Sequence, residues 1–335
     1  MKALIVGGGS IGSRHLRNLR ALGIGSLGLV EISADRRQAL GAESGAISFS
    51  RLDSGLDWGP DFVIIATPSH LHVEQALAVV KRGFDVFVEK PLAHAGAGLT
   101  ELSALVKSKR VISIVGCNMR FHPGPAKVKE LLDQGSIGKI LFARFQFGYY
   151  LPDWRPGVDY RANYAAREDS GGGCILDGIH EIDLARWMLG EIEQVTCFAS
   201  RLSSLEIETE DVAAILCRHE NAAISEIHLD YVQRSYQRSC QVAGELGTIF
   251  WDFNERRVRW YDGISGQWTN FEQPGEWQLN DMYVDEVEHF LACVRDRAPT
   301  MLPIEDAVGL MRATFAAKES ARRASPVWAA SGSAV

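Results

Sequence analysis

The sequence lacks the features that mark membrane, nucleic-acid-binding and disulfide-rich proteins. No stretch approaches the ~18 consecutive apolar residues of a membrane-spanning helix, and no run of basic residues exceeds two. The net charge of −7 argues against a nucleic acid or an anionic membrane surface as a partner. The six cysteines are scattered without a C-x-x-C pair, which predicts reduced, buried thiols. Three glycines end the first apolar run too early for a secretory signal, so we expect a soluble cytoplasmic protein.

The first 120 residues alternate short apolar strands with helical segments. A chain of 335 residues is long enough for two domains. Strands are predicted at residues 3–6, 27–30, 61–66, 84–88 and 111–115. Helices are predicted between them, at residues 11–20, 35–41, 72–82 and 98–107. Near-continuous apolar strands separated by helices are typical of a parallel sheet covered on both faces, so residues 1–120 are expected to form an α/β domain.

After residue 121 apolar and polar residues alternate, as in strands with one buried face. Such strands are predicted at residues 138–150, 195–201, 212–218, 223–230, 237–243 and 257–261. Helices are predicted at residues 174–189, 281–295 and 304–324. We expect an α+β domain over residues 121–325, built on a large, mainly antiparallel open sheet, with its last helix available to pack back on the first domain. Residues 326–335 are expected to be a frayed tail.

A glycine pattern, Gly7-x-Gly9-x-x-Gly12, follows the first strand and opens a helix. The first glycine permits a tight turn, the second lets the backbone approach a pyrophosphate, and the third lets helix and strand pack closely. The amino terminus of the helix then presents free N–H groups to phosphates. The alternative is a structural glycine turn, which chance would often supply in a chain with 32 glycines. The flanking strand and helix favour a dinucleotide site.

A carboxylate stands where a dinucleotide site needs one. Glu31 ends the second predicted strand, 19 residues after Gly12, where it can bind the ribose hydroxyls of adenosine. Because a carboxylate repels a 2′-phosphate, Glu31 favours NAD over NADP. Arg36 and Arg37 leave NADP open, since a nearby arginine can accommodate that phosphate. The alternative, which we favour, is that both arginines lie on the solvated face of the following helix.

Two turns bring polar residues to the same edge of the predicted sheet. Thr67-Pro68 follows the third strand, and Lys90 follows residues 84–88, directly before Pro91. Ligands of open parallel sheets gather at the carboxyl ends of the strands, so Lys90 is placed to touch a cofactor or its substrate. His72 is expected to brace the next helix, because a lone histidine is more often structural than chemical.

Three glycines at residues 171–173 lead into a predicted helix that carries Asp177, His180 and Asp183. Steps of three residues turn about 300° on a helix, so neighbouring members lie about 60° apart. An imidazole between two carboxylates can act as a general base. The alternative is a histidine satisfied within a domain interface. No metal site is expected, because the spacing lacks an H-x-x-x-H pair.

Six motifs, in this order, resemble the glucose-fructose oxidoreductase / inositol dehydrogenase / rhizopine catabolism (Gfo/Idh/MocA) family over nearly the whole chain. They are Gly7-Gly8-Gly9-Ser10-Ile11-Gly12 with Arg14-His15, Ala66-Thr67-Pro68 with His72, Glu89-Lys90-Pro91, Asn118-Met119-Arg120-Phe121, Gly171-Gly172-Gly173 through His180-x-x-Asp183 with Trp187 and Gly190, and Gly244-Glu245-Leu246-Gly247-Thr248. Residues 150–161 and 179–183 also resemble a subgroup associated with nonulosonate and surface-sugar pathways. The resemblance implies a Rossmann domain followed by a domain whose sheet packs in homo-oligomers, as dimers or tetramers.

The resemblance also implies catalytic roles. Lys90 would donate to the reacting hydroxyl, and His180 would take its proton while a hydride moves to the nicotinamide. The family usually places an aspartate four residues before this histidine, where this chain has Leu176. We expect Asp177, one position later, to be the third catalytic residue if the helix start shifts. The expected cofactor-binding residues are Gly7, Gly9, Ser10, Ile11, Gly12, Glu31, Thr67, Pro68, His72, Glu89, Lys90 and Asn118.

Several cations and hydroxyls lie near the expected substrate cleft. With Lys90, Asp177 and His180, the candidates are Arg120, Trp154, Arg155, Tyr160, Arg161 and Tyr164. Arginines suit an anionic sugar, unless they pair with neighbouring acids at the surface. The sequence therefore predicts an NAD(P)-dependent dehydrogenase of a sugar, sugar acid, nucleotide sugar or polyol. The alternatives are a dinucleotide-sensing co-repressor, against which intact Lys90 and His180 argue, and an NAD-dependent redox-neutral glycosidase.

Overall fold

The computed structural model describes residues 1–329, which form two compact units. The first unit contains Met1–Cys117 and Leu279–Val308, and the second contains Asn118–Gln278 and the chain from Gly309. Helix α9 (Asp281–Asp296) falls within residues 121–325 of the sequence, yet it belongs to the first unit.

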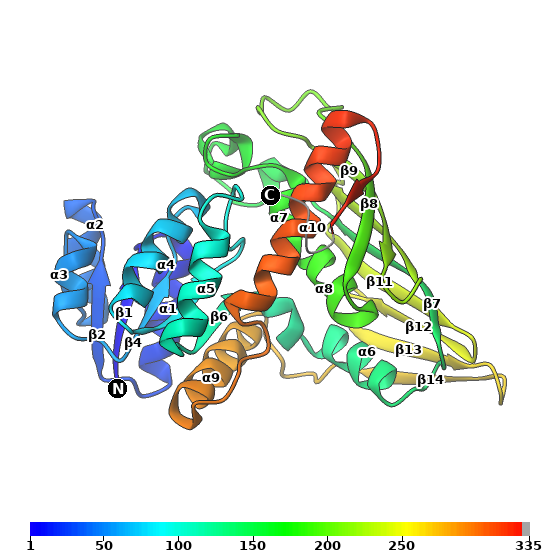
Figure 1. Cartoon of the computed structure of the whole chain (residues 1–335), viewed down its shortest axis with the longest axis horizontal. Coiled ribbons are helices and arrows are strands. Elements are labelled where there is room, and N and C mark those ends of the chain that lie inside the picture. The colour runs from blue at the N-terminus through cyan, green and yellow to red at the C-terminus, as the bar shows by residue number, and fades with distance from the viewer. Residues whose placement is uncertain (330–335) are drawn as a thin grey trace. The chain divides into compact units, whose positions relative to one another are not determined.

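A six-stranded sheet of parallel strands, counted over residues 1–329, forms the centre of the first unit (Figure 1). In spatial order its strands are β3 (Ile47–Phe49), β2 (Ser26–Val30), β1 (Lys2–Val6), β4 (Phe62–Ile65), β5 (Asp85–Glu89) and β6 (Ser113–Gly116). Every residue of β4 and β5 is buried, as expected for strands covered on both faces. The predicted parallel sheet is confirmed.

Helices flank this sheet, and one of them comes from far along the chain. The helices before residue 117 are α1 (Ser10–Ala21), α2 (Ala34–Ser44), α3 (Leu52–Asp57), α4 (His72–Lys81) and α5 (Leu99–Lys109), with a 3₁₀ turn η1 (Ser69–Leu71). The ring of Phe290, on α9, packs edge-on against Phe62 and Phe87 at centroid distances of 5.6 and 5.8 Å. The sequence missed α3 and the edge strand β3, because both are short and Ile47 on β3 is exposed.

The second unit contains a larger sheet of nine strands, again counted over the described residues. In spatial order the strands are β14 (Gln267–Glu272), β13 (Arg257–Asp262), β12 (Gly247–Asp252), β11 (Gln237–Gly244), β7 (Ile140–Gly148), β10 (Ile224–Asp230), β9 (Val212–His219), β8 (Ile192–Ser200) and β15 (Val327–Trp328). All neighbours pair antiparallel except β7 and β10, so the predicted mainly antiparallel sheet is confirmed. The sequence missed β12, β14 and β15.

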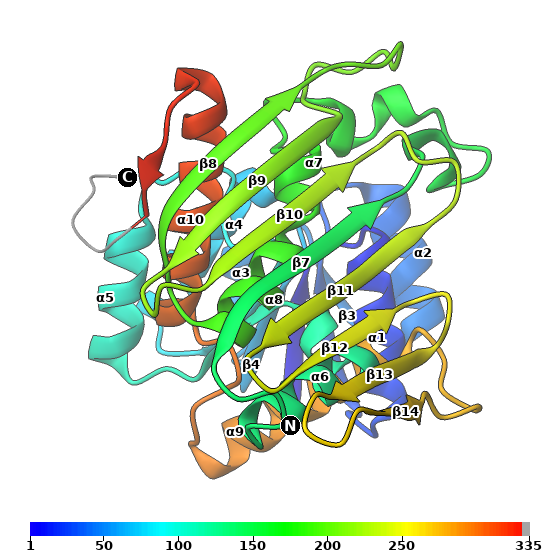
Figure 2. The ribbon, with the colours of Figure 1, turned by 90° about the vertical axis from the view of Figure 1, so that its right-hand side faces the viewer.

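One face of this large sheet is covered and the other is open, as Figure 2 shows. Exposed and buried residues alternate along β9 and β10, which is the pattern that the sequence predicts. Helices α6 (Pro123–Asp133) and α8 (Ile179–Leu189) pack against the covered face. The last helix, α10, spans Ile304–Arg323.

In the connection from β7 to α7 (Cys174–Asp177), short 3₁₀ turns are the only helices, and no strand forms. They are η3 (Leu151–Asp153), η4 (Tyr160–Ala162) and η5 (Tyr164–Ala166), while η2 (Asn118–Phe121) precedes α6. Part of the expected frayed tail forms strand β15, and its remainder, residues 330–335, lies outside the described residues. Within residues 1–329 no helix is both long and apolar enough to cross a membrane.

Candidate active site

The glycine turn after β1 is packed too tightly for side chains at two of its three positions. Gly7 has φ of 100°, and a Cβ there would lie 2.7 Å from the carbonyl oxygen of Ala66. A Cβ at Gly12 would lie 1.9 Å from the carbonyl oxygen of Gly7. A Cβ at Gly9 would meet nothing within 4 Å, so the backbone there is open to a ligand. Helix α1 begins at the next residue without an acidic side chain in its first turn, so its positive end suits a pyrophosphate.

The carboxylate of Glu31 is buried and fixed at the end of β2. Its Oε2 accepts from the backbone N–H of Gly8 at 2.9 Å, and its Oε1 accepts from that of Ser33 at 2.8 Å. The Nη1 atom of Arg36 lies 3.5 Å from Glu31 Oε2, so Arg36 reaches the carboxylate rather than only the solvent. Arg37 instead donates to the backbone carbonyl of Glu31 at 2.7 Å. The arrangement fits the adenosine end of a dinucleotide.

His72 connects the two turns that end β4 and β5. Its Nδ1 lies 2.8 Å from the carbonyl oxygen of Pro91, and its Nε2 lies 2.7 Å from that of Thr67. Burial lowers the pKa of His72, while the two carbonyl oxygens oppose that shift by favouring the protonated ring. The side chain therefore braces the turn formed by Lys90 and Pro91, which are joined by a cis peptide bond.

A second brace reaches Lys90 from the glycine helix. Glu89 Oε1 lies 2.7 Å from Nε2 of His15 on α1, and Glu89 Oε2 accepts from the backbone N–H of Lys90 at 3.2 Å. The residue beside Lys90 is thereby tied to the helix whose amino terminus faces the nucleotide position. Apart from its place in a family motif, nothing in the sequence singled out His15.

In the second unit, Asp177 and His180 do not share one continuous helix, so that prediction is wrong. Helix α7 ends at Asp177 and α8 begins at Ile179. The break falls at Gly178, where a Cβ would lie 2.6 Å from Cδ2 of Leu229 and 2.8 Å from a carbonyl oxygen of α7. Both Asp177 and His180 are buried.

Two tyrosines bind the carboxylate of Asp177. The hydroxyl of Tyr164 donates to Oδ1 at 2.6 Å, and the hydroxyl of Tyr231 donates to Oδ2 at 2.5 Å. The ring of Trp154 packs edge-on against Tyr231 at a centroid distance of 5.2 Å. The structure thus groups three residues that the sequence predicted, Asp177, Tyr164 and Trp154. Asp177 and Trp154 both contact Tyr231, which the sequence did not indicate. The only available signal was that a tyrosine at the end of a buried strand needs a hydrogen-bond partner.

The other predicted carboxylate on α8, Asp183, belongs to an ion pair. Nε and Nη2 of Arg120 donate to Asp183 Oδ2 and Oδ1 at 2.8 and 2.7 Å, and both side chains are buried. The guanidinium also lies over the ring of Trp187, 5.2 Å from its centroid. Asp183 is therefore paired with Arg120. The sequence had predicted instead that Asp183 and Asp177 would flank the imidazole of His180. Asn118, at the start of η2, is also buried in this unit.

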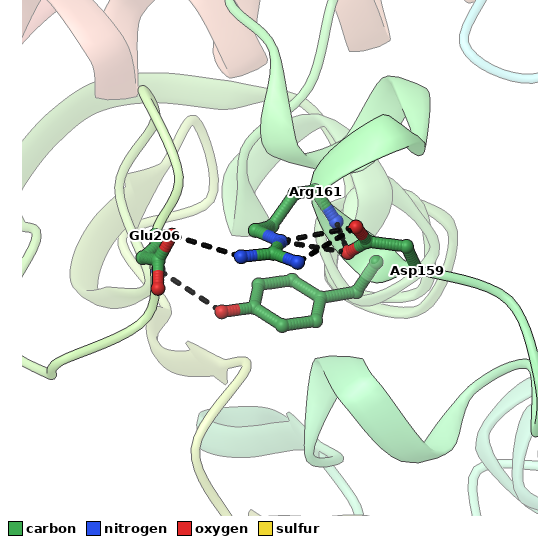
Figure 3. A network of polar contacts seen from close by, with 4 residues as sticks. Asp159, Arg161 and Glu206 are labelled. Atoms are coloured by element: carbon green, nitrogen blue, oxygen red, sulfur yellow. Dashed lines mark hydrogen bonds and ion pairs between the residues drawn. The ribbon is translucent and has the colours of Figure 1, made fainter.

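The arginine of η4 is similarly occupied by carboxylates (Figure 3). Arg161 donates to both oxygens of Asp159, at 2.9 to 3.1 Å, and its Nη1 donates to Glu206 at 3.2 Å. The backbone N–H of Glu206 donates to the hydroxyl of Tyr160 at 3.2 Å. These contacts match the alternative that neighbouring acids pair with the arginines. Arg155 and Arg161 are both exposed.

Metal ligands are not grouped in the part of the chain that the structure describes. Among residues 1–329 no three His, Cys, Asp or Glu side chains come together in a way that could hold a metal ion. The six cysteines, all among these residues, are free and buried.

Comparisons with known proteins agree with this architecture. Residues 1–117 match a family model described as "Oxidoreductase family, NAD-binding Rossmann fold", and residues 126–250 match one described as "GFO/IDH/MocA C-terminal domain". Levoglucosan dehydrogenase of Pseudarthrobacter phenanthrenivorans is 32% identical over 58% of this chain and 53% of its own, so that match spans about half of the relative. Inositol 2-dehydrogenase 2 of Saccharopolyspora erythraea is 30% identical over 78% of this chain and 76% of its own.

A solved structure extends the likeness to almost the whole fold. GenD2 from gentamicin A biosynthesis, in complex with NAD, superposes with a TM-score of 0.83 and 26% identity. The match covers 98% of this chain and 96% of that one. The chain therefore belongs to the Gfo/Idh/MocA family of oxidoreductases, and residues 1–117 are its NAD-binding Rossmann domain.

Proposed function

We propose that the protein transfers a hydride between NAD and a secondary hydroxyl of a cyclic sugar or polyol. The observation that carries the proposal is the bracing of Lys90 by His72 and Glu89 at the nucleotide edge of the parallel sheet. A cation fixed there suits a hydroxyl that gains negative charge during reaction. The named relatives, an inositol and a levoglucosan dehydrogenase, act on substrates of this class and support the choice.

Each catalytic side chain has one task in this proposal. His180 takes the hydroxyl proton as the C–H bond on the same carbon breaks, and Lys90 donates a hydrogen bond to the oxygen. Asp177 supplies the negative charge that balances the cations around the reacting group. NAD, when bound, supplies the hydride acceptor. In the reducing direction His180 returns the proton to the same oxygen.

The cofactor would be held by the residues of the first unit. The open backbone at Gly9 and the amino terminus of α1 suit the pyrophosphate, and Glu31 suits the adenosine ribose. A fixed carboxylate at this position supports NAD over NADP. Thr67, Pro68 and the segment from Glu89 to Lys90 would then line the nicotinamide end.

The ion pairs of two candidate arginines bear on the charge of the substrate. Arg120 and Arg161 already bind carboxylates of this chain, at Asp183 and Asp159. An anionic sugar would have to compete with these pairs, so a neutral polyol or sugar is the better-supported substrate. The nonulosonate-type substrates suggested by residues 150–161 remain a prediction to be tested in the same panel.

The test is a panel of neutral and anionic sugars, polyols and nucleotide sugars, followed by NADH absorbance and product analysis. Lys90→Ala and His180→Ala should each abolish turnover while the dissociation constant of NADH changes only a few-fold. Full activity in both variants would overturn the proposal. Product formation without net NADH would indicate the redox-neutral glycosidase, and cofactor binding without any turnover would indicate the regulator.

We also propose that the protein is a cytoplasmic homo-oligomer joined through the open face of the large sheet. Its six free, buried thiols suit a reducing compartment. Phe198 on that face is 73% exposed, and Leu216 and Ile224 on neighbouring strands are half exposed. An exposed apolar patch of this kind favours association.

Light scattering after gel filtration tests this association. Phe198→Asp should yield monomers. Leu202→Asp, at an equally exposed leucine that lies outside the strands, should leave the oligomer intact. A wild-type monomer at micromolar concentration would contradict the association.

A further inference from the structure

The carboxylate of Asp177 is fixed from two sides, although it stands one residue away from the usual family position. Tyr164 approaches Oδ1 from the irregular connection before α7, and Tyr231 approaches Oδ2 from the end of β10. Their oxygen–oxygen distances of 2.6 and 2.5 Å lie in the range of hydrogen bonds to an ionised carboxylate. With one donor on each oxygen, the carboxylate plane cannot rotate freely.

Tyr231 is suited to act as a permanent donor. Tyr231 is fully buried, and its backbone N–H donates to the carbonyl oxygen of Asp211 at 2.8 Å. The perpendicular ring of Trp154 holds its own ring in place. Burial, followed by the charge of Asp177, raises the pKa of Tyr231 well above its ordinary value, so the hydroxyl keeps its proton at any working pH.

The two tyrosines differ in access to a substrate. Tyr164 is partly exposed, whereas Tyr231 is fully buried and cannot touch a bound sugar. Any effect of the Tyr231 hydroxyl on the reaction must therefore pass through Asp177. The break at Gly178 brings Asp177 to the end of α7, where both tyrosines reach it.

We propose that Tyr231, together with Tyr164, is a positioning residue that fixes the Asp177 carboxylate for the reaction. Through these two hydrogen bonds the carboxylate serves the site from a position one residue later than the family's usual aspartate. The inference rests on the proposed function, because it assumes that Asp177 acts in that reaction. A purely structural Tyr231 would instead affect only stability.

Removal of single hydroxyl groups tests the proposal on the full-length protein. Tyr231→Phe should lower kcat by about 10- to 100-fold, as expected for losing a hydrogen bond to a charged group. KM and the NADH dissociation constant should stay within about threefold, because neither ligand touches this hydroxyl. The deuterium isotope effect, with the substrate labelled at the reacting carbon, should not fall below that of wild type, because the chemical step has slowed.

A matched control is available in the same aromatic region. Tyr236 is largely buried and packs against Tyr149 and Phe253, but its hydroxyl is not among the donors to Asp177. Tyr236→Phe should therefore keep kcat within about threefold of wild type. An equal loss of kcat in Tyr236→Phe and Tyr231→Phe would overturn the specific role of Tyr231.

Variants of Asp177 separate this inference from the proposed function. Full activity in Asp177→Asn would refute the catalytic role of Asp177, and with it the proposed mechanism at this residue. If Asp177→Asn is impaired while Tyr231→Phe is as active as wild type, only the positioning role fails. The double variant should lose no more than Asp177→Asn alone, because the tyrosine acts through the carboxylate. Should Tyr231→Phe not fold, Tyr164→Phe decides in its place: a lower kcat with KM within about threefold of wild type supports the inference, whereas full activity or a loss in KM alone overturns it.

Discussion

Nε2 of His15 lies 2.7 Å from Oε1 of Glu89, and this contact joins the nucleotide-facing helix α1 to the residue before Lys90. The other carboxylate oxygen of Glu89 accepts from the backbone N–H of Lys90. A change at the glycine turn can therefore reach the proposed catalytic lysine through a single carboxylate. Within the first unit, the two oxygens of Glu89 thus connect helix α1 with the backbone of Lys90.

Glu89→Gln should disturb the placement of Lys90 without a large change in cofactor binding. The amide keeps the size of the side chain but removes its negative charge and presents an NH₂ group to one of its two partners, so the contact with His15 or with the backbone N–H of Lys90 is weakened. We expect kcat to fall about tenfold while the NADH dissociation constant changes less than about threefold. Steady-state kinetics and NADH fluorescence titration measure the two quantities.

The control for this change is Glu74→Gln on α4, an exposed carboxylate in the same unit. It should leave both kcat and NADH affinity unchanged. A Glu89→Gln protein with wild-type kcat would show that Lys90 is held without the carboxylate of Glu89.

Glu31 and Arg36 together should set the choice between NADH and NADPH. Removing the carboxylate in Glu31→Ser removes the repulsion of a 2′-phosphate and leaves the guanidinium of Arg36, now 3.5 Å from Glu31, free to bind it. The affinity for NADPH relative to NADH should rise about tenfold, as measured by fluorescence titration.

Two double variants test the assignment to Arg36. Glu31→Ser with Arg36→Ala should lose most of the gain. Glu31→Ser with Arg37→Ala should keep it, because Arg37 points to backbone carbonyls at the end of β2. Tighter binding of NADPH than NADH by the wild-type protein would contradict the role given to Glu31.

Gly178→Ala should destabilise the second unit. The new methyl group would lie 2.6 Å from Leu229 Cδ2, in a buried region where neighbours cannot easily move. We expect a loss of about 1–3 kcal/mol in the free energy of unfolding, together with lower activity as Asp177 shifts. Urea unfolding followed by tryptophan fluorescence measures the stability.

Gly275→Ala provides the comparison, because a Cβ at Gly275 would meet nothing within 4 Å. It should change the unfolding midpoint little. Equal midpoints for the two variants would mean that the turn at Gly178 tolerates a side chain.

The sequence predicted the elements whose signals are local. Strand β4 is a continuous apolar run, and the glycine turn after β1 lies beside its strand and helix, so both could be read from neighbouring residues. Strand β14 was missed because its residues are mostly polar and exposed on both faces, which leaves no alternation. Strand β15 has two residues, too few to form any pattern.

Contacts within the candidate site were harder to predict, because they join distant parts of the chain. Tyr231 lies 54 positions after Asp177, and Glu89 lies 74 positions after His15. The need for a glycine directly after α7 also has a distant cause, since Leu229 on β10 fills the space that a side chain at Gly178 would need. Residue types indicated which side chains could do the chemistry, whereas only the fold shows which groups position them.

The last prediction concerns acid stability. His122 is fully buried, and rings of Trp251, Phe253 and Trp277 surround it at centroid distances of 5.2, 5.4 and 4.6 Å. Its Nδ1 accepts from the backbone N–H of Gly124 at 3.0 Å, which requires the neutral ring. Burial lowers the pKa of His122 from 6.5 to about 3, with nearby arginine charges adding to the shift.

Because the folded-state pKa lies below the unfolded value, the unfolded chain binds a proton first as the pH falls. The stability of the second unit should therefore decrease between about pH 6.5 and pH 3, by up to about 1.4 kcal/mol per pH unit from this group.

His122→Asn replaces the ring with an uncharged cap that can still accept from Gly124. It should be less stable at pH 8, since the smaller side chain leaves a cavity, but its urea midpoint should fall less steeply toward acid. His70→Asn, at an exposed histidine, should keep the wild-type slope. Identical slopes for His122→Asn and wild type would show that His122 already titrates normally in the folded protein.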